Sequence, residues 1–240
     1  MRFNSDQIQK IGKEISSKVD GKTLFDEFSR GRYSTDASVY QIKPLGVVLP
    51  KDTNDVLSLM EYSQKNSVPL LARGGGSSQC GQTVGESVVL DYSKHQNKIL
   101  ELNVEEKYVW VQPGVVLDHL NAYLKPHGLW FPVDVSTSSR ATIGGMSANN
   151  SCGSRSLYYG NMVHNVLSIE AILDDGSIFN FDQINKNYLA TKNNQDRLYK
   201  IIDKFIDVRQ QVGGEIDANW PTTQRRVGGY NIDLIDPEGF

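Results

Sequence analysis

Three consecutive glycines, Gly74–Gly76, come shortly after an apolar run that is typical of a short β-strand, Val68–Leu71. Glycine carries no side chain, so successive backbone N–H groups can approach an anion closely and surround it. Arg73 precedes the glycines and the polar run Ser77–Gln79 follows them, which adds side-chain donors. A flexible turn is the simpler interpretation of a bare glycine run, but the flanking donors favour a phosphate-binding loop. Ligands of open α/β sheets bind at the carboxyl ends of strands, where this loop begins.

The composition limits the class of protein. The chain has 240 residues and a mass of 26.8 kDa, enough for one large domain or two small ones. The net charge of -3 argues against a nucleic-acid-binding domain, which would carry an excess of basic residues. No apolar run approaches the ~20 residues that cross a bilayer, so we expect no transmembrane segment. The start of the chain also lacks the apolar core of a secretory signal. We expect a cytoplasmic protein, with peripheral association at the inner membrane as the alternative.

The spacing of apolar residues predicts a mixed order of helices and strands. An apolar run at 45–49, a helix that begins at Asp52 or Thr53 and the run at 68–71 suggest a βαβ unit with a parallel strand pair. Before it, isoleucines spaced three and four apart predict an amphipathic helical arm. After it, the sequence predicts strands at 88–91, 99–102 and 108–111, a helix at 115–125, a hairpin of strands 166–173 and 177–181, and a helix around 198–206.

A second segment, Ser136–Ser154, is also rich in small polar residues, since 13 of its 19 residues are Gly, Ser, Thr or Asn. A long surface loop is the simple interpretation. Such loops without structure of their own are uncommon unless they are functional, which favours a ligand role. Its backbone amides would form a second anion-binding surface. Two facing surfaces of this kind suit a pyrophosphate and the ring system beyond it.

Other nucleotide-binding and metal-binding patterns are missing. No Gly-Lys-Ser/Thr follows the glycines, so the loop is not a P-loop, and Gln79 stands where a dinucleotide-binding GxGxxG would have its third glycine. Cys80 and Cys152 form no CxxC pattern, and we predict neither a zinc site nor a disulfide framework. The histidines show no spacing typical of a catalytic base or a metal site; they are His95, His119, His127 and His164.

Several separated motifs together resemble one family. Pro69-Leu-Leu-Ala-Arg-Gly-Gly-Gly-Ser-Ser and Pro132-Val-Asp-Val-Ser-Thr-Ser-Ser-Arg-Ala-Thr-Ile-Gly-Gly-Met are similar to the FAD-binding domain of the FAD-linked oxidases, the p-cresol methylhydroxylase type. Gly46-Val-Val-Leu-Pro, Val111-Gln-Pro-Gly-Val and Leu173-Asp-Asp-Gly-Ser fit the same family in order and spacing. The resemblance spans about residues 40–240, and the D-lactate, glycolate and D-2-hydroxyglutarate dehydrogenase branch matches best.

This resemblance implies an α+β fold of two α/β subdomains with FAD between them. It implies an N-terminal helical arm at 1–38, an FAD-binding domain at 39–190 with subdomains at about 39–95 and 96–190, and a helix with the start of a flavin-proximal segment at 191–240. Some relatives attach the flavin through a histidine directly after the glycines. Ser77 stands there, so we expect non-covalent FAD. The implied cofactor-binding residues are Arg73, Gly74, Gly75, Gly76, Ser77, Ser78, Gln79, Gly81 and Gln82 at the pyrophosphate, Pro132, Asp134, Thr142, Gly144, Gly145, Ala148 and Asn149 at the flavin, and Ile169 at the adenine.

The implied reaction is the oxidation of a D-2-hydroxy acid to the 2-oxo acid, with electrons passing to a quinone, a cytochrome or an iron–sulfur centre. In the tail, Arg225 and Arg226 are expected either to bind the substrate carboxylate or to form a solvated basic pair. Tyr230 is expected either to pack against the rest of the fold or to lie in the active site. The family's later flavin segment, substrate cap and histidine-rich site have no counterpart here. We therefore expect an N-terminal fragment that is inactive alone. The alternatives are a non-catalytic FAD-binding module and the FAD subunit of a molybdenum hydroxylase.

The glycine run yields a first prediction. Gly75→Val is expected to abolish FAD binding, because a β-branched side chain would block a phosphate and disfavour a positive φ. The measurement is a titration of purified apo protein with FAD. Unchanged FAD affinity in a folded variant would contradict it.

Overall fold

The computed structural model of the chain describes residues 3–182, 197–223 and 225–235. Its first part is built on a four-stranded sheet in the order β1-β2-β4-β3, formed by β1 (Lys22–Leu24), β2 (Gly46–Leu49), β4 (Val88–Asp91) and β3 (Leu70–Arg73). Strands β2 and β3 both run parallel to β4, while β1 is antiparallel to β2. The parallel direction of the βαβ strands agrees with the sequence. The expected direct pairing is wrong, because β4 lies between them.

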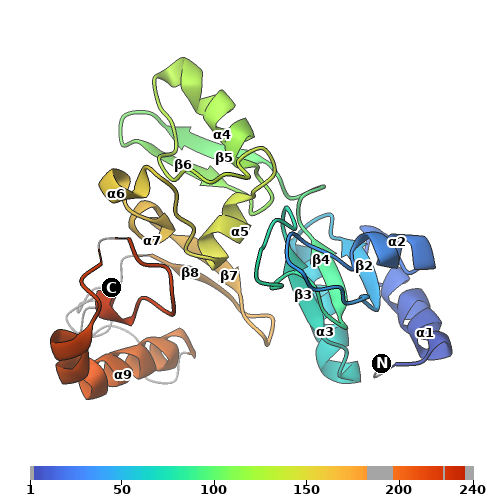
Figure 1. Ribbon diagram of the computed structural model, residues 1–240. Coiled ribbons are helices and arrows are strands. Elements are labelled where there is room, and N and C mark those ends of the chain that lie inside the picture. Colours follow the sequence, from blue (N-terminus) through green and yellow to red (C-terminus); the bar gives the residue numbers. More distant parts are fainter. Residues whose placement is uncertain (1–2, 183–196, 224, 236–240) are drawn as a thin grey trace.

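Three helices accompany this sheet: α1 (Ser5–Ser16), α2 (Glu27–Arg32) and α3 (Thr53–Asn66). Asn4 begins α1 with a reciprocal capping box, in which its side chain accepts from the N–H of Gln7 at 2.9 Å. The apolar stripe of α1 packs into the same core as Val48 and Val88. Helix α1 therefore packs against the first sheet, and β1 pairs with β2 at its edge (Figure 1), while the division of the chain at residue 38 stays a prediction.

Strands β2 and β4 are buried along their whole length. Parallel strands covered on both faces are continuously apolar rather than alternating, which explains the runs Val47–Leu49 and Val88–Leu90. The strand edge that carries the carboxyl ends of β3 and β4 therefore has a rigid base.

A buried aspartate connects α3 to the sheet. Asp55 is 4% exposed, and its carboxylate accepts from the backbone N–H groups of Lys51 at 2.7 Å, Asp20 at 2.7 Å and Gly21 at 2.9 Å. These bonds join the end of β2, the start of α3 and the turn before β1. One buried carboxylate thus holds these three chain segments together.

The second part begins with the antiparallel pair β5 (Ile99–Asn103) and β6 (Tyr108–Val111), followed by α4 (Leu117–Leu124) and a 3-10 turn, η1 (Lys125–His127). Short helices then follow: α5 (Ile143–Ala148), α6 (Ser156–Tyr159) and α7 (Met162–Asn165). The last described elements are the hairpin β7 (Ile169–Ile172) and β8 (Ile178–Phe181), α9 (Arg197–Asn219) and the 3-10 turn η2 (Ile232–Leu234).

The hairpin predicted from Asp174-Asp175-Gly176 is confirmed, and Gly176 takes the positive φ of 82° that the turn needs. Its turn reaches back to α3, where the side chain of Gln64 donates to the carbonyl of Asp174. Ile172 also packs against the core of the first part. The hairpin therefore bridges the two parts of the chain (Figure 1).

The sequence boundary expected near residues 185–195 lies outside the described residues, so the division at residue 190 stays a prediction. Within the described residues, no helix is both long enough and apolar enough to cross a membrane.

Asp55 gives a test of this arrangement. Asp55→Ala should lower the free energy of unfolding by about 3 kcal/mol, because three backbone donors lose a charged acceptor in a buried position. Urea unfolding followed by circular dichroism measures this change. Glu105→Ala, an exposed carboxylate between β5 and β6, is the matched control and should stay near the wild-type value. Equal stabilities of the two variants would refute the assignment.

Candidate binding site between two glycine-rich segments

The two glycine-rich segments of the sequence meet in the structure. Residues 74–83, here called the glycine loop, leave β3 and face α5 (Figure 1). A Cβ on Gly74 would overlap the hydroxyl of Thr142, and a Cβ on Gly75 would overlap the backbone carbonyl of Arg140. The side chain of Gln82 donates to Oδ1 of Asn149 at 3.2 Å. The segments are thus in contact at both ends, and the glycines are needed for that contact.

The backbone of the glycine loop carries unused donors. Within the described part of the chain, the N–H groups of residues 74–79 donate to no acceptor. Gly76 has a φ of 61° and Gly81 a φ of 80°, both in the left-handed region. Gly75 is not in that region, so the expected strain at this residue is wrong; contact with Arg140 is the reason that it must be glycine. A run of free amides in a bent loop is suited to binding an oxyanion.

The second segment is ordered differently from the predicted loop. Residues 143–148 form helix α5, and Thr142, which is 2% exposed, caps it by accepting from the N–H of Gly145 at 3.4 Å. The N–H of Ile143 donates to Val115 at 2.8 Å and that of Gly144 to Pro113 at 2.9 Å. These two amides are therefore not free for an anion and do not belong to the expected second set of donors. The segment supplies a wall instead.

Close packing explains the two glycines of α5. A Cβ on Gly144 would lie 2.6 Å from Cβ of Pro113, and one on Gly145 would lie 3.2 Å from Oγ1 of Thr142. Ala148 and Asn149, at the end of this helix, are exposed. The exposed end of α5 thus contacts the glycine loop through Asn149, and the small side chain of Ala148 beside it stays at the surface.

Arg73 does not extend into the space beside the loop. Its guanidinium donates to the carbonyls of Thr35 at 3.0 Å and Thr83 at 3.2 Å, and lies 5.2 Å from the ring centre of Tyr33. A Cβ on Gly76 would overlap this guanidinium, so the charge lies directly against the loop backbone. Among the described residues Arg73 forms no ion pair, and its positive charge is not neutralised by a carboxylate.

Other polar groups of the glycine loop are turned toward each other. The hydroxyl of Ser78 donates to Oε1 of Gln82 and accepts from the N–H of Cys80 at 3.3 Å. Ser77 is half-buried, and Gln79 is exposed. The Ser78 and Gln82 side chains therefore shape the loop, and its backbone amides remain the main donors.

Asp134 fixes the far end of the second segment. Its carboxylate accepts from the hydroxyl of Ser154 at 2.6 Å and the N–H of Arg155 at 2.9 Å. Partial burial opposes the effect, but these hydrogen bonds lower the pKa of Asp134 below its ordinary value. A Cβ on Gly153 would overlap the carbonyl of Asp134, which makes the crossing very close. Pro132 is half-buried just before this crossing.

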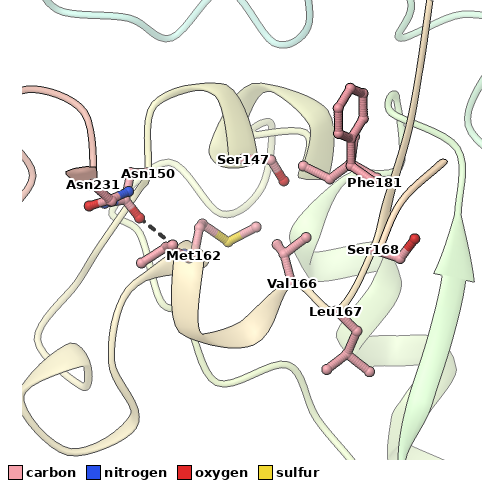
Figure 2. Close-up of a pocket in the computed structure, with 10 residues that line it drawn as sticks. Ser147, Asn150, Met162, Val166, Leu167, Ser168, Phe181 and Asn231 are labelled. Atoms are coloured by element: carbon pink, nitrogen blue, oxygen red, sulfur yellow. Dashed lines mark hydrogen bonds between the residues drawn. The ribbon is translucent and has the colours of Figure 1, made fainter. Parts of the chain in front are cut away.

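A cavity of about 240 Å³ continues from the end of α5. Asn150 and Asn231 lie at one end and Phe181 and Ser168 at the other, with Met162 between them (Figure 2). Asn150 has a φ of 45°, and its side chain accepts from the N–H of Val163 at 3.0 Å and donates to Asn231 at 3.2 Å. The other lining residues are Ser147, Val163, Val166, Leu167 and Ile169. The predicted Ile169 is therefore at a cavity beside the second segment.

The tail residues are partly engaged. Arg226 forms an ion pair with Asp233, and its guanidinium lies 5.0 Å from the ring centre of Trp220. Arg225 donates to the carbonyl of Gly153 at 3.0 Å, next to the second segment. Tyr230 is 94% exposed. Of Arg225, Arg226 and Tyr230, it is thus Arg225 whose side-chain hydrogen bond reaches the second segment.

Sequence reasoning missed residues 33–42, which hold the guanidinium of Arg73. The polar run Ser34-Thr35-Asp36 before the first apolar strand was the one signal available. No group of three or more His, Cys, Asp or Glu side chains that could bind a metal ion occurs in the part of the chain that the structure describes.

Comparisons with known proteins add to this geometry. A family profile described as an FAD binding domain matches residues 44–182. The D-2-hydroxyglutarate dehydrogenase of Haemophilus influenzae is 41% identical over 212 residues, which are 84% of this chain and 20% of that protein. Glycolate oxidase subunit GlcD of Bacillus subtilis is 37% identical over 176 residues, which are 71% of this chain and 37% of that protein. The chain therefore spans a minor part of these relatives.

A solved structure of alkyldihydroxyacetonephosphate synthase superposes with a TM-score of 0.64 at 21% identity, covering 72% of this chain and 34% of that chain. At this identity the likeness concerns the fold. It agrees with the α+β architecture expected from the sequence.

The contact between the segments can be tested without a ligand. Gly75→Ala should lower the free energy of unfolding by about 1–3 kcal/mol, because its Cβ would meet backbone rather than a movable side chain. Gly85→Ala is the matched control, since its Cβ would have ordinary contacts of 3.6 Å and 3.7 Å. Urea unfolding of both variants measures the difference, and equal values would rule out the contact.

Proposed function

The chain belongs to the FAD binding domain family, and on that premise we propose that it holds FAD for the oxidation of a D-2-hydroxy acid to the 2-oxo acid. The observation that carries the proposal is the meeting of the glycine loop with residues 140–149. The substrate class comes from the relatives, among them a D-2-hydroxyglutarate dehydrogenase and a glycolate oxidase subunit.

The donor set fits a pyrophosphate. The backbone amides of residues 74–79, which donate to no acceptor among the described residues, can each donate to a phosphate oxygen, and the charge of Arg73, without an ion pair in the same part of the chain, lies behind them. Serine follows the glycines at position 77, so this position offers no histidine for a covalent flavin link. This supports non-covalent FAD.

The two ends of the cofactor are proposed to follow the second segment. Gln82 and Asn149 join the glycine loop to the end of α5, and the cavity that includes Ile169 begins at the next residue, Asn150. We place the adenine in that cavity. The flavin would then lie along Pro132, Asp134, Thr142, Gly144, Gly145 and Ala148, of which Thr142 and the glycines shape the wall by packing.

FAD, when bound, supplies the two-electron redox chemistry at the substrate carbon. The residues of this chain bind and orient it. Arg225 is the proposed contact for the substrate carboxylate, because it donates to a carbonyl beside the second segment and forms no ion pair among the described residues. Arg226 is paired with Asp233 and Tyr230 is exposed, so their proposed part in substrate binding is secondary.

The proposal includes an electron acceptor of the quinone, cytochrome or iron–sulfur class. The expected cytoplasmic location, or peripheral association at the inner membrane, also stays a prediction. A non-catalytic FAD-binding module is the second candidate, because the chain spans 20% of the length of the Haemophilus enzyme.

The cofactor part is tested by titrating apo protein with FAD and following the absorbance of the flavin band and its fluorescence. We expect saturable binding by the wild type and none by Gly75→Val, whose side chain would overlap Arg140 and open the junction. If adding the wild-type protein changes neither the absorbance band nor the fluorescence of FAD at any FAD concentration, the proposal is contradicted.

To test the proposed substrate class, the chain must be joined to the part of a relative that it does not cover. We propose a chimera in which this chain replaces the matched 212 residues of the Haemophilus D-2-hydroxyglutarate dehydrogenase. Anaerobic addition of D-2-hydroxyglutarate, D-lactate or glycolate should bleach the bound flavin, whereas L-2-hydroxyglutarate should not. Flavin that stays bound and oxidised with every acid would favour the non-catalytic module.

A further inference from the structure

Residues 33–42, here called the strap, connect α2 with the approach to β2 and lie against the glycine loop. The strap closes on itself: the N–H of Ile42 donates to Ser34 at 2.9 Å, and Thr35 forms a bridge with Gln41. The family match begins at residue 44, after the strap has ended. Nothing in that match therefore assigns it a role.

Arg73 is the first connection between the strap and the loop. Its guanidinium donates to the strap carbonyl of Thr35 and to the loop carbonyl of Thr83, and stacks near the ring of Tyr33. The hydroxyl of Tyr33 in turn donates to Asp91 at 2.6 Å, at the end of β4. The strap thus determines where the positive charge of Arg73 lies, which is against Gly76.

Asp36 is the second connection. Its carboxylate accepts from the hydroxyl of Thr83 in the loop at 3.0 Å and from the N–H of Ser38 in the strap at 2.8 Å. Although partial burial opposes it, the hydrogen bonds from Ser38 and Thr83 lower the pKa of Asp36 below its ordinary value. The carboxylate is therefore charged at neutral pH and holds both segments at one point.

Tyr40 is the third connection. Its ring covers Gly81, where a Cβ would lie 2.6 Å from Cδ2 of the ring. The loop is thus held at Arg73 where it begins, at Gly81 near its end and at Thr83, its last residue. The free amides of residues 74–79 lie between these points.

A loop with three successive glycines has many conformations, and fixing it costs conformational entropy when an anion binds. Contacts that hold the loop beforehand remove part of this cost and tighten binding without touching the ligand. The strap supplies such contacts from outside the loop and from outside the family match.

We propose that the strap is a functional part of the FAD site, and that Asp36 is a positioning residue that holds the glycine loop in its anion-binding shape through Thr83. This inference rests on the proposed FAD binding. It assigns the strap a part in the affinity for the pyrophosphate and no contact with the cofactor.

The test is an FAD titration of the full chain carrying Asp36→Ala, Thr83→Val, both changes, or Asp36→Asn. The two single variants should each weaken FAD binding about three- to tenfold, the effect of one lost hydrogen bond. The double variant should be no weaker than the weaker single variant, because both remove the same bond. Asp36→Asn keeps one acceptor oxygen and should recover most of the affinity. Glu105→Ala is the control and should bind like the wild type.

The outcomes separate the two proposals. A wild-type chain that binds no FAD contradicts the proposed function. If the wild type binds FAD and both Asp36→Ala and Thr83→Val bind it as tightly as the wild type, the role of the strap is contradicted. Additive losses in the double variant, or no recovery in Asp36→Asn, would also contradict it. Thermal unfolding of each apo variant accompanies the titration; if Asp36→Ala does not fold, Thr83→Val, which keeps the size of the side chain, decides.

Discussion

The candidate site depends on one close approach of backbone to backbone, between Gly75 of the glycine loop and Arg140 before α5. No side chain fits between them, so the two segments share a boundary that is set by main-chain geometry. Strand β3, which pairs with the buried strand β4, leads into one side of this contact. Helix α5 holds the other side through the bonds of Ile143 and Gly144 to the turn at 113–115.

The sequence predicts those parts of the fold that local chemistry determines. The start of α3 at Asp52, the hairpin turn at Gly176 and the apolar strands all follow from capping, turn and burial patterns. The position of β4 between β2 and β3 could not be predicted, since strand order depends on contacts between distant residues. The same holds for α1, whose apolar stripe indicates burial against some partner without naming the first sheet as that partner.

The same distinction between local chemistry and contacts of distant residues explains which parts of the site could be predicted. The glycine loop is recognisable because its unusual composition is local, and its free amides follow from glycine geometry. The direction of a side chain depends on acceptors that the fold brings to it, so Arg73 and Asp134 were expected as ligand contacts. In the structure the guanidinium of Arg73 bonds to the strap, and the carboxylate of Asp134 bonds to the turn at Ser154; both remain proposed parts of the cofactor site. The amides of α5 looked free for a comparable reason, since their acceptors at 113–115 lie far away in sequence.

A family match and a folded unit have different boundaries, because one is set by recurring sequence and the other by contacts. The match begins at residue 44, yet α1, β1 and the strap contribute core, sheet and loop contacts to the region that it covers. The net charge of the chain is -3, so attraction of an anion must come from local placement of charge rather than from composition. The strap provides that placement by fixing Arg73 against Gly76 with neutral carbonyls, which orient its charge without cancelling it. The folded unit that contains the family match therefore begins well before residue 44.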